Sequence, residues 1–149
     1  MRACPHTAVD TCGFAAWKTL ERARAYTDLF LFDLKLMDDR LHRQYTGVSN
    51  EPILRNLRKL SDKGHAIRLR LPIIPGVNDA PWQIRQIGEF AAGLPHLDGL
   101  DILPYHNIAA EKYRRLNRVY ALPETLLPTE AQIAGIAQIL RECGLQVAG

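Results

Sequence analysis

The sequence predicts an α/β fold in which a parallel sheet is built from about four consecutive β–α units. Short apolar runs of strand length alternate along the chain with longer segments whose apolar residues recur at helical spacing. This alternation is typical of β–α–β units. With 149 residues, 47% of them hydrophobic and 23% charged, residues 1–149 have the size and composition of one globular domain.

Five strand-length segments are expected, and turn-forming residues close several of them. They cover residues 6–10, 28–34, 66–74, 97–103 and 145–147. The first closes at Thr11-Cys12-Gly13, and the third ends at Pro75-Gly76. In the second, the run Leu-Phe-Leu-Phe lies between charged residues, which is typical of a buried parallel strand.

Helices are expected between these strands. They cover residues 15–26, 50–63, 78–92 and 129–143. Asn50, the pair Asn78-Asp79 and Thr129 are the expected N-caps, because short polar side chains accept hydrogen bonds from the free N–H groups of a first turn. A glycine follows each of the last three helices, as is common at helix ends.

Composition and charge exclude several classes of protein. The net charge of +3 is too small to indicate a nucleic-acid-binding protein. No apolar run approaches the length of a membrane span or of a signal peptide. Three widely spaced cysteines, Cys4, Cys12 and Cys143, do not suggest a secreted disulfide framework. We therefore expect a cytoplasmic location, with neither nucleic acid nor a membrane as partner.

Several other side chains are interpreted as structural, the histidines as solvated and the tryptophans as packing residues. They are His42, His65, His96, Trp17 and Trp82. A long segment at 104–128 contains a basic stretch at 112–118. That stretch is interpreted first as a solvated helix face and second as a surface for a partner.

Polar side chains gather where the expected strands stop. They are Asp10, Thr11, Asp33, Lys35, Arg68, Arg70, Tyr105 and His106. In parallel α/β sheets and barrels, ligands lie beyond the carboxyl ends of the strands. Carboxylates, an amine, guanidinium groups and an imidazole together suit a zwitterionic ligand that carries a carboxylate and hydroxyls, with a cation bound beside it.

A structural interpretation of the same residues stays open at this point. Charges are common at strand ends because strands end at the surface. Asp10 and Thr11 fit a turn. Asp33 and Lys35 alternate along one strand, so they share a face and can form a plain ion pair.

Five short motifs, in order, resemble those of pyruvate formate-lyase activating enzymes and related glycyl-radical-enzyme activating enzymes, which are radical-SAM proteins. The motifs are Asp10-Thr11-Cys12-Gly13, Asp33-Leu34-Lys35, Thr46-Gly47-Val48-Ser49-Asn50, the segment 68–76 with its R-x-x-x-x-P-G pattern, and Leu103-Pro104-Tyr105-His106. The resemblance covers nearly the whole chain. It implies a partial (β/α) TIM-like barrel, of which the chain holds about four units of the six-unit radical-SAM barrel.

The resemblance also implies a binding site for S-adenosylmethionine. Lys35 would pair with the carboxylate of this cosubstrate, and Arg70 would reach it from the next strand. Pro72 would line the adenine side, and His106 would contact the nucleoside end. Arg68 shares a face with Arg70, so the choice between the two arginines stays open.

The same resemblance implies a monovalent cation beside the carboxylate of the cosubstrate. Asp10, Thr11 and Asp33 would supply oxygen ligands to the cation, and the carbonyl of Leu31 would join them. Such an ion would offset two neighbouring negative charges.

The sequence lacks the cysteine motif with which the family holds its iron–sulfur cluster. That motif, C-x-x-x-C-x-x-C, supplies the thiolates of a [4Fe-4S] cluster, and neither it nor a G-G-E segment is present. We therefore expect the chain to match the last four units of the barrel, with the first two missing. Without ligands for the cluster, the chain is expected to be inactive alone.

Two functions are retained. In the first, the chain is part of a radical-SAM activase, an oxidoreductase that would cleave S-adenosylmethionine and generate a glycyl radical on a partner glycyl-radical enzyme. In the second, it is a non-catalytic interaction module or remnant that binds a partner protein. The first strand would be an exposed parallel edge, so self-association is also expected.

Overall fold

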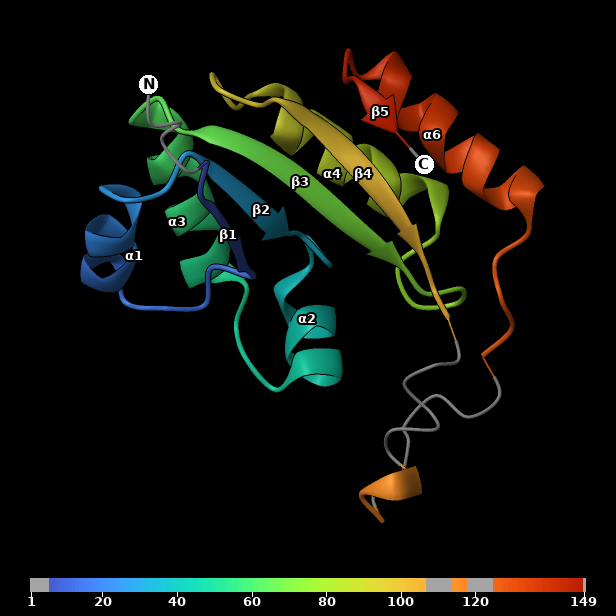
Figure 1. The fold of residues 1–149 in the computed structure, drawn as a ribbon. Coiled ribbons are helices and arrows are strands. Elements are labelled where there is room, and N and C mark those ends of the chain that lie inside the picture. Colours follow the sequence, from blue (N-terminus) through green and yellow to red (C-terminus); the bar gives the residue numbers. More distant parts are fainter. Residues whose placement is uncertain (1–5, 107–113, 118–124, 149) are drawn as a thin grey trace.

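The computed structural model describes residues 6–106, 114–117 and 125–148 (Figure 1). The strands are β1 (Ala8–Thr11), β2 (Leu29–Asp33), β3 (Ala66–Ile73), β4 (Gly99–Pro104) and β5 (Val147–Ala148). The helices are α1 (Trp17–Arg24), α2 (Asp39–Thr46), α3 (Glu51–Asp62), α4 (Pro81–Ala92) and α6 (Glu130–Glu142). The prediction of an α/β fold is confirmed.

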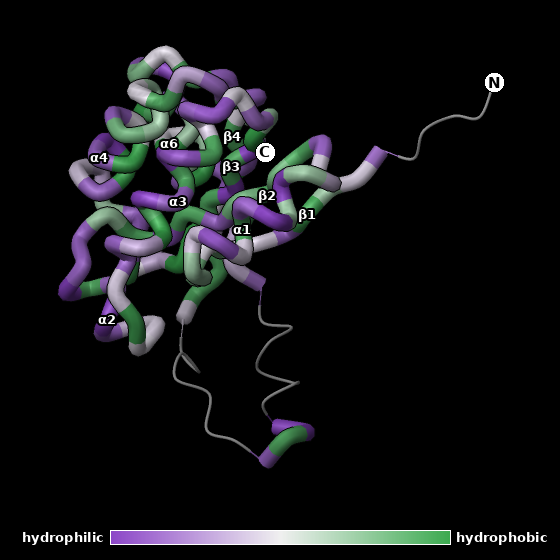
Figure 2. The backbone as a smooth tube through the Cα atoms, turned by 90° about the vertical axis from the view of Figure 1, so that its left-hand side faces the viewer, coloured by the Kyte–Doolittle hydropathy of each residue, from purple (hydrophilic) through white to green (hydrophobic). Residues whose placement is uncertain are grey.

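The strands form one parallel sheet in the order β1-β2-β3-β4-β5, so that each strand pairs with its neighbours along the chain. Helices α3, α4 and α6 lie on the same side of this sheet, as the two views at right angles show (Figures 1 and 2). Consecutive strand order with helices on one side is the arrangement of a barrel segment, because a doubly wound sheet carries helices on both faces.

The two faces of the sheet differ in burial. In β3, the side chains of Ile67, Leu69, Leu71 and Ile73 are fully buried, whereas Arg68, Arg70 and Pro72 between them are half-buried. The same alternation holds in β2, where Phe30 and Phe32 are fully buried and Leu29, Leu31 and Asp33 are not. Side chains of a strand point alternately to the two faces, and only one face packs against helices. We call the other side the open face.

Helix α2 was not expected from the sequence, although its end signals are present. The side chain of Asp38 accepts a hydrogen bond from the backbone N–H of Leu41 at 2.8 Å, which caps the first turn. Gly47 follows the last turn with a φ of +81°, a left-handed conformation that glycine adopts readily. The helix has only eight residues, too few to show a clear apolar repeat.

One of the expected N-caps is wrong and another is confirmed. Ala80, and not the Asn78-Asp79 pair, precedes α4. At α6, the side chain of Thr129 accepts from the backbone N–H of Gln132, and Gln132 returns the bond, as a capping box does. Asn50 does precede α3, but its side chain does not cap that helix.

The basic stretch at 112–118, interpreted as a solvated helix face or a partner surface, lies mostly outside the described residues, because only 114–117 is described. Among the described residues, none of the helices has the length and apolar composition of a membrane span. Trp17 packs against the core, as expected, but the expectation for Trp82 is wrong because its side chain is 53% exposed.

Candidate functional site

The carboxyl ends of β1, β2 and β3 meet at one edge of the sheet, which we call the rim. The register aligns Asp10 with Leu31 and Arg68, and Asp33 with Arg70, so that these open-face side chains lie in two adjacent rows. The side chain of Arg70 reaches across to Asp10 and joins the charged residues into one continuous row. The parallel sheet therefore brings together Asp10, Asp33 and Arg70, which were expected to share a site.

Arg70 lies between the two carboxylates and bonds to both. Its Nε donates to Asp33 Oδ1 at 2.8 Å, its Nη1 donates to Asp10 Oδ2 at 2.8 Å, and its Nη2 also contacts both side chains. Hydrogen bonds from Arg70 to Asp10, and next to Asp33, raise the pKa of the guanidinium above its ordinary value, against the effect of partial burial. The guanidinium thus links the ends of β1 and β2 through the open face.

Lys35 extends the same row of charges beyond the end of β2. Its Nζ lies 3.5 Å from Asp33 Oδ2, and its side chain is 36% exposed. Asp33 is therefore shared between Lys35 and Arg70. The plain ion pair that was left open as an alternative is present, and Lys35 is the more accessible cation of the two.

Arg68 occupies the open face one step nearer the amino end of β3. Its Nε and Nη2 donate to the two carboxylate oxygens of Asp101 at 2.8 and 2.7 Å, and its Nη1 lies 3.6 Å from Asp98. The hydrogen bonds to Asp101 raise the pKa of this guanidinium. Arg68 is thus held by β4 and its preceding loop, whereas Arg70 is held by the two strands of the rim.

The turn after β1 depends on Thr11 and Gly13. The Thr11 hydroxyl oxygen accepts a hydrogen bond from the backbone N–H of Gly13 at 2.9 Å. Gly13 has a φ of +72°, and a Cβ built on it would lie 2.1 Å from the Phe32 ring. The turn therefore requires glycine both for its backbone conformation and for the close approach of β2.

The remaining predicted site residues lie on the open face or beyond it. Leu31 is half-buried beside Asp10, and Pro72 follows Arg70 on the same face of β3. His106 is exposed and follows the end of β4 by two residues. Among the described residues, no group of three or more histidine, cysteine, aspartate or glutamate side chains is arranged to hold a metal ion.

A cavity of about 220 Å³ adjoins the rim beside β2. Its lining includes Asp33 and Lys35 together with Cys12 and His42, two residues that sequence reasoning left out of the site. The expectation that His42 is solvated is wrong: it is 3% exposed, and its Nδ1 lies 2.8 Å from the carbonyl of Val48. The position of His42 four residues before Thr46, in a helical stretch, was the available signal.

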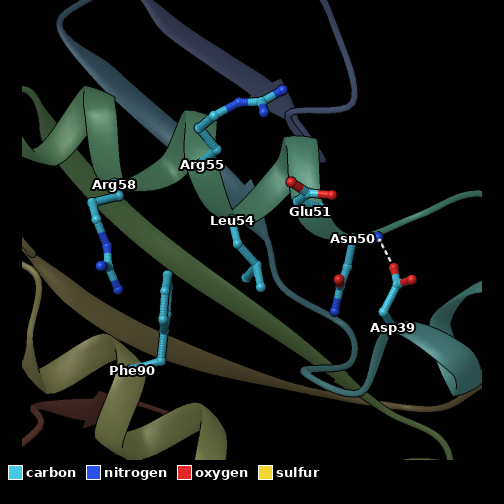
Figure 3. Close-up of a pocket in the computed structure, with 7 residues that line it drawn as sticks. All are labelled: Asp39, Asn50, Glu51, Leu54, Arg55, Arg58 and Phe90. Atoms are coloured by element: carbon cyan, nitrogen blue, oxygen red, sulfur yellow. Dashed lines mark hydrogen bonds between the residues drawn. The ribbon is translucent and has the colours of Figure 1, made fainter.

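A larger groove, of about 680 Å³, lies on the helical side of the molecule (Figure 3). Leu54 and Arg58 of α3 face Phe90 of α4 there, with the guanidinium carbon of Arg58 5.2 Å from the centre of the Phe90 ring. At one end, the backbone N–H of Asn50 donates to Asp39 at 2.9 Å. None of the predicted site residues lines this groove, so the rim is the candidate site.

The chain is similar to known proteins both in sequence and in structure. No family model matches the chain. The trans-4-hydroxy-L-proline dehydratase activating enzyme of Clostridioides difficile is 38% identical over 136 residues, which are 90% of this chain and 45% of that protein. The pyruvate formate-lyase-activating enzyme of Streptococcus mutans is 32% identical over 141 residues, 91% of this chain and 54% of that protein. The chain spans about half the length of these curated relatives.

A solved structure decides the family. The crystallised domain of a pyruvate-formate lyase-activating enzyme from Bacteroides vulgatus matches with a TM-score of 0.80 and 32% identity, over 96% of this chain and 80% of that one. The chain belongs to the glycyl-radical-enzyme activating enzymes. A radical SAM methyltransferase from Sphaerobacter thermophilus, 19% identical with a TM-score of 0.69, shares the fold over 95% of this chain and 39% of its own.

Membership in the activating-enzyme family confirms the predicted fold class. The sheet is part of a TIM-like partial barrel, to which this chain contributes four β–α units and the short strand β5. In this activating-enzyme domain, the rim is the carboxyl edge at which barrel ligands lie. The helices α3, α4 and α6 form a layer on one side of the sheet. Because barrel helices form the outer ring, the open face corresponds to the inner side of the barrel.

Proposed function

We propose that this chain is the cosubstrate-binding part of a radical-SAM activase that uses S-adenosylmethionine to generate a glycyl radical on a partner enzyme. One observation carries the proposal. This chain belongs to the activating-enzyme family, and the carboxyl edge of its parallel sheet carries a row of charged side chains, Asp10, Arg70, Asp33 and Lys35. A zwitterionic amino acid group needs both signs of charge close together, and this row supplies them.

Lys35 is the side chain proposed to hold the carboxylate of S-adenosylmethionine. An ammonium carries three donors, and within the described structure the Lys35 ammonium contacts one carboxylate, at 3.5 Å. The donors of Arg70 face Asp10 and Asp33, so Arg70 is proposed to orient the row and to reach the ligand from its edge. Pro72 and His106 are proposed for the adenine and nucleoside sides.

A monovalent cation is proposed at the oxygens of Asp10, Thr11, Asp33 and the carbonyl of Leu31. Both carboxylates contact Arg70, so a cation would compete with this guanidinium for the same oxygen atoms. The affinity for potassium or sodium is therefore expected to rise when the charge of Arg70 is removed.

The residues present do not fit an iron–sulfur cluster. The sequence has three cysteines and no C-x-x-x-C-x-x-C motif, and the two in the described structure lie after β1 (Cys12) and after α6 (Cys143). A cluster of the family type needs three thiolates on one loop. We therefore propose that the chain holds S-adenosylmethionine without the redox centre and is inactive alone.

The alternative is a non-catalytic interaction module that binds a partner protein, and one observation favours it. Each of the four charged residues of the rim already has an oppositely charged partner. Because these charges already neutralise one another, the row does not need a ligand to be stable. A glycyl-radical enzyme as partner, a cytoplasmic location and self-association through the β1 edge remain predictions under both functions.

Calorimetry with S-adenosylmethionine tests the leading function. The wild-type chain is expected to bind, and Lys35→Ala is expected to weaken binding about tenfold, the effect of one charge-assisted hydrogen bond. The matched control is Lys18→Ala on the exposed surface of α1, which should bind like the wild type. Equal binding by all three proteins would remove Lys35 from the site, and no binding by the wild type would favour the interaction module.

Anaerobic reconstitution with iron and sulfide tests the second part of the proposal. No stoichiometric cluster should form, because the thiolates are missing. A cluster whose absorbance responds to S-adenosylmethionine would contradict the claim that the chain lacks a redox centre.

A further inference from the structure

Asn78 lies in the turn after β3 and joins the ends of two strands of the rim. Its side chain is 3% exposed. Its Nδ2 donates to the carbonyl of Lys35 at 3.0 Å and to the carbonyl of Pro72 at 2.7 Å, while its Oδ1 accepts from the backbone N–H of Ile74 at 2.8 Å. Two of its partners are residues proposed to hold S-adenosylmethionine.

These contacts can be made only by an amide in this orientation. The carbonyls of Lys35 and Pro72 only accept hydrogen bonds, and the backbone N–H of Ile74 only donates. A carboxylate of the same shape would place an oxygen against two carbonyl oxygens. Position 78 thus requires asparagine because its hydrogen-bond partners need both a donor and an acceptor, and not because of the volume of the side chain.

The position of Asn78 is explained by Pro72. The β2–β3 ladder reaches the hydrogen bond from the N–H of Leu34 to the carbonyl of Arg70, at 3.0 Å. In a regular parallel ladder, the next bond would come from the N–H of residue 72. Proline has no N–H, so the ladder stops just before Lys35. The Asn78 amide restores a link between the two strands one step farther along.

Two further buried asparagines hold rim segments in the same way. Asn56, which is 1% exposed, donates from Nδ2 to the carbonyls of Gly13 and Ala15 at 2.8 and 2.9 Å, in the segment that follows β1. Asn50 donates to the carbonyls of Leu36 and Met37 at 3.0 and 2.7 Å, after Lys35. Each amide ties down the chain just beyond a rim strand, where the ladder no longer does.

We propose that Asn78 is a positioning residue that fixes Lys35 and Pro72 relative to each other at the end of the β2–β3 ladder. It touches no ligand in this assignment and acts through the backbone of those two residues. The part of the inference that concerns ligand affinity rests on the proposed function, whereas the part that concerns the strand ends does not.

The test compares Asn78→Asp with a control of the same kind at the other end of the sheet. Ser61 is fully buried, and its Oγ donates to the carbonyl of His96 and accepts from the N–H of His96, before β3 and β4 begin. Ser61→Ala therefore also removes two buried hydrogen bonds, but far along the strands from the rim. Both variants of the full 149-residue chain are measured by thermal unfolding, amide hydrogen exchange and calorimetry with S-adenosylmethionine.

Asn78→Asp is expected to weaken S-adenosylmethionine binding about tenfold more than Ser61→Ala does, at a similar loss of unfolding temperature. The amide of Leu34 should exchange faster in Asn78→Asp only. If the two variants bind equally, Asn78 does not position the site. If the wild type binds no S-adenosylmethionine, the proposed function fails, and unchanged exchange of the Leu34 amide in Asn78→Asp would then overturn this inference separately.

If Asn78→Asp does not fold, the double variant Asn78→Ala/Pro72→Ala decides the question, because it removes the Asn78 amide without setting a carboxylate against the carbonyls of Lys35 and Pro72. Alanine supplies the N–H that the ladder lacks at position 72, so the double variant should fold and should protect the Leu34 amide. A double variant that also fails to fold would contradict the view that Asn78 replaces the missing ladder bond.

Discussion

Arg70 Nε donates to Asp33 Oδ1 at 2.8 Å between two strands that the register places side by side. The same guanidinium reaches Asp10 on the next strand, so one cation spans three strands. The Arg70 guanidinium thus lies between the carboxylates of Asp10 and Asp33 at the rim and offsets their negative charges.

Arg70→Gln is expected to destabilise the chain by about 1 to 2 kcal/mol, because it removes charge-assisted hydrogen bonds and leaves two carboxylates facing each other. The exposure of Asp10, whose side chain is 64% accessible, keeps the effect below that of a buried pair. Urea unfolding measures it. Arg85→Gln, which breaks the surface pair with Glu142, should stay within about 0.5 kcal/mol of the wild type. Equal losses in the two variants would contradict a special role for Arg70.

The carboxyl group of Asp39 is expected to make the folded chain less stable in acid. Hydrogen bonds from Arg43, Ser49 and the backbone of Asn50 lower the pKa of its carboxyl from 3.8 to about 2. The folded state therefore binds the proton less well than the unfolded chain, so the stabilisation is complete above pH 4 and is lost as the pH falls to 2. The unfolding midpoints of the wild type and Asp39→Asn should differ at pH 6 and converge by pH 2. A constant difference would show that the Asp39 charge contributes nothing.

His65 is a basic group, but its lowered pKa also makes the stability of the fold increase with pH. Partial burial, then the charges of Arg24 and Lys63, lower its pKa below 6.5. Arg24 Nη1 lies 3.1 Å from His65 Nε2, which suits a neutral imidazole that accepts the bond. The unfolded chain takes up the proton more readily, so stability should rise as the pH increases from 5 to 7. His65→Gln should abolish that rise, and exposed His106→Gln should retain it.

Gly13→Ala is expected to cost more than about 2 kcal/mol, because alanine would need a left-handed conformation and its Cβ would collide with Phe32. Gly135→Ala is the matched control. Gly135 lies within α6, and a Cβ there meets nothing within 4 Å. That change should stabilise the chain by about 0.5 to 1 kcal/mol, since alanine is the better helix former. Thermal unfolding of both variants separates backbone strain from a general effect of added methyl groups.

Most of the strands were predictable because they are short apolar runs bounded by turn-forming or charged residues. The burial of β2 on only one face was not, because Leu29 and Leu31 are as apolar as Phe30 and Phe32. Which face receives the helices is decided by the whole sheet and not by a single run. The motifs at the strand ends identified Asp10, Asp33, Lys35 and Arg70, since parallel strands deliver consecutive carboxyl ends to one edge.

The errors concern side chains whose partners are distant in the sequence. Asn78 is of a residue type that often caps helices, and its side chain does bond to the backbone. The acceptors, however, are the carbonyls of Lys35 and Pro72. His42 was judged by its lack of metal-like spacing, yet it is buried against the carbonyl of Val48. A local pattern reveals that a side chain seeks backbone partners and cannot reveal which ones.

The open face has a consequence for the behaviour of this chain in water. Beside the apolar side chains of Leu29, Leu31 and Pro72, it carries three cationic side chains and four carboxylates, all seven of them in ion pairs. These are Lys35, Arg68, Arg70, Asp10, Asp33, Asp98 and Asp101. The charged groups hydrate readily, and their position between the apolar side chains limits the continuous apolar area that this face exposes. Water therefore hydrates the charged side chains of this inner wall. The ion pairs that hold these side chains in place are expected to weaken at high salt concentration.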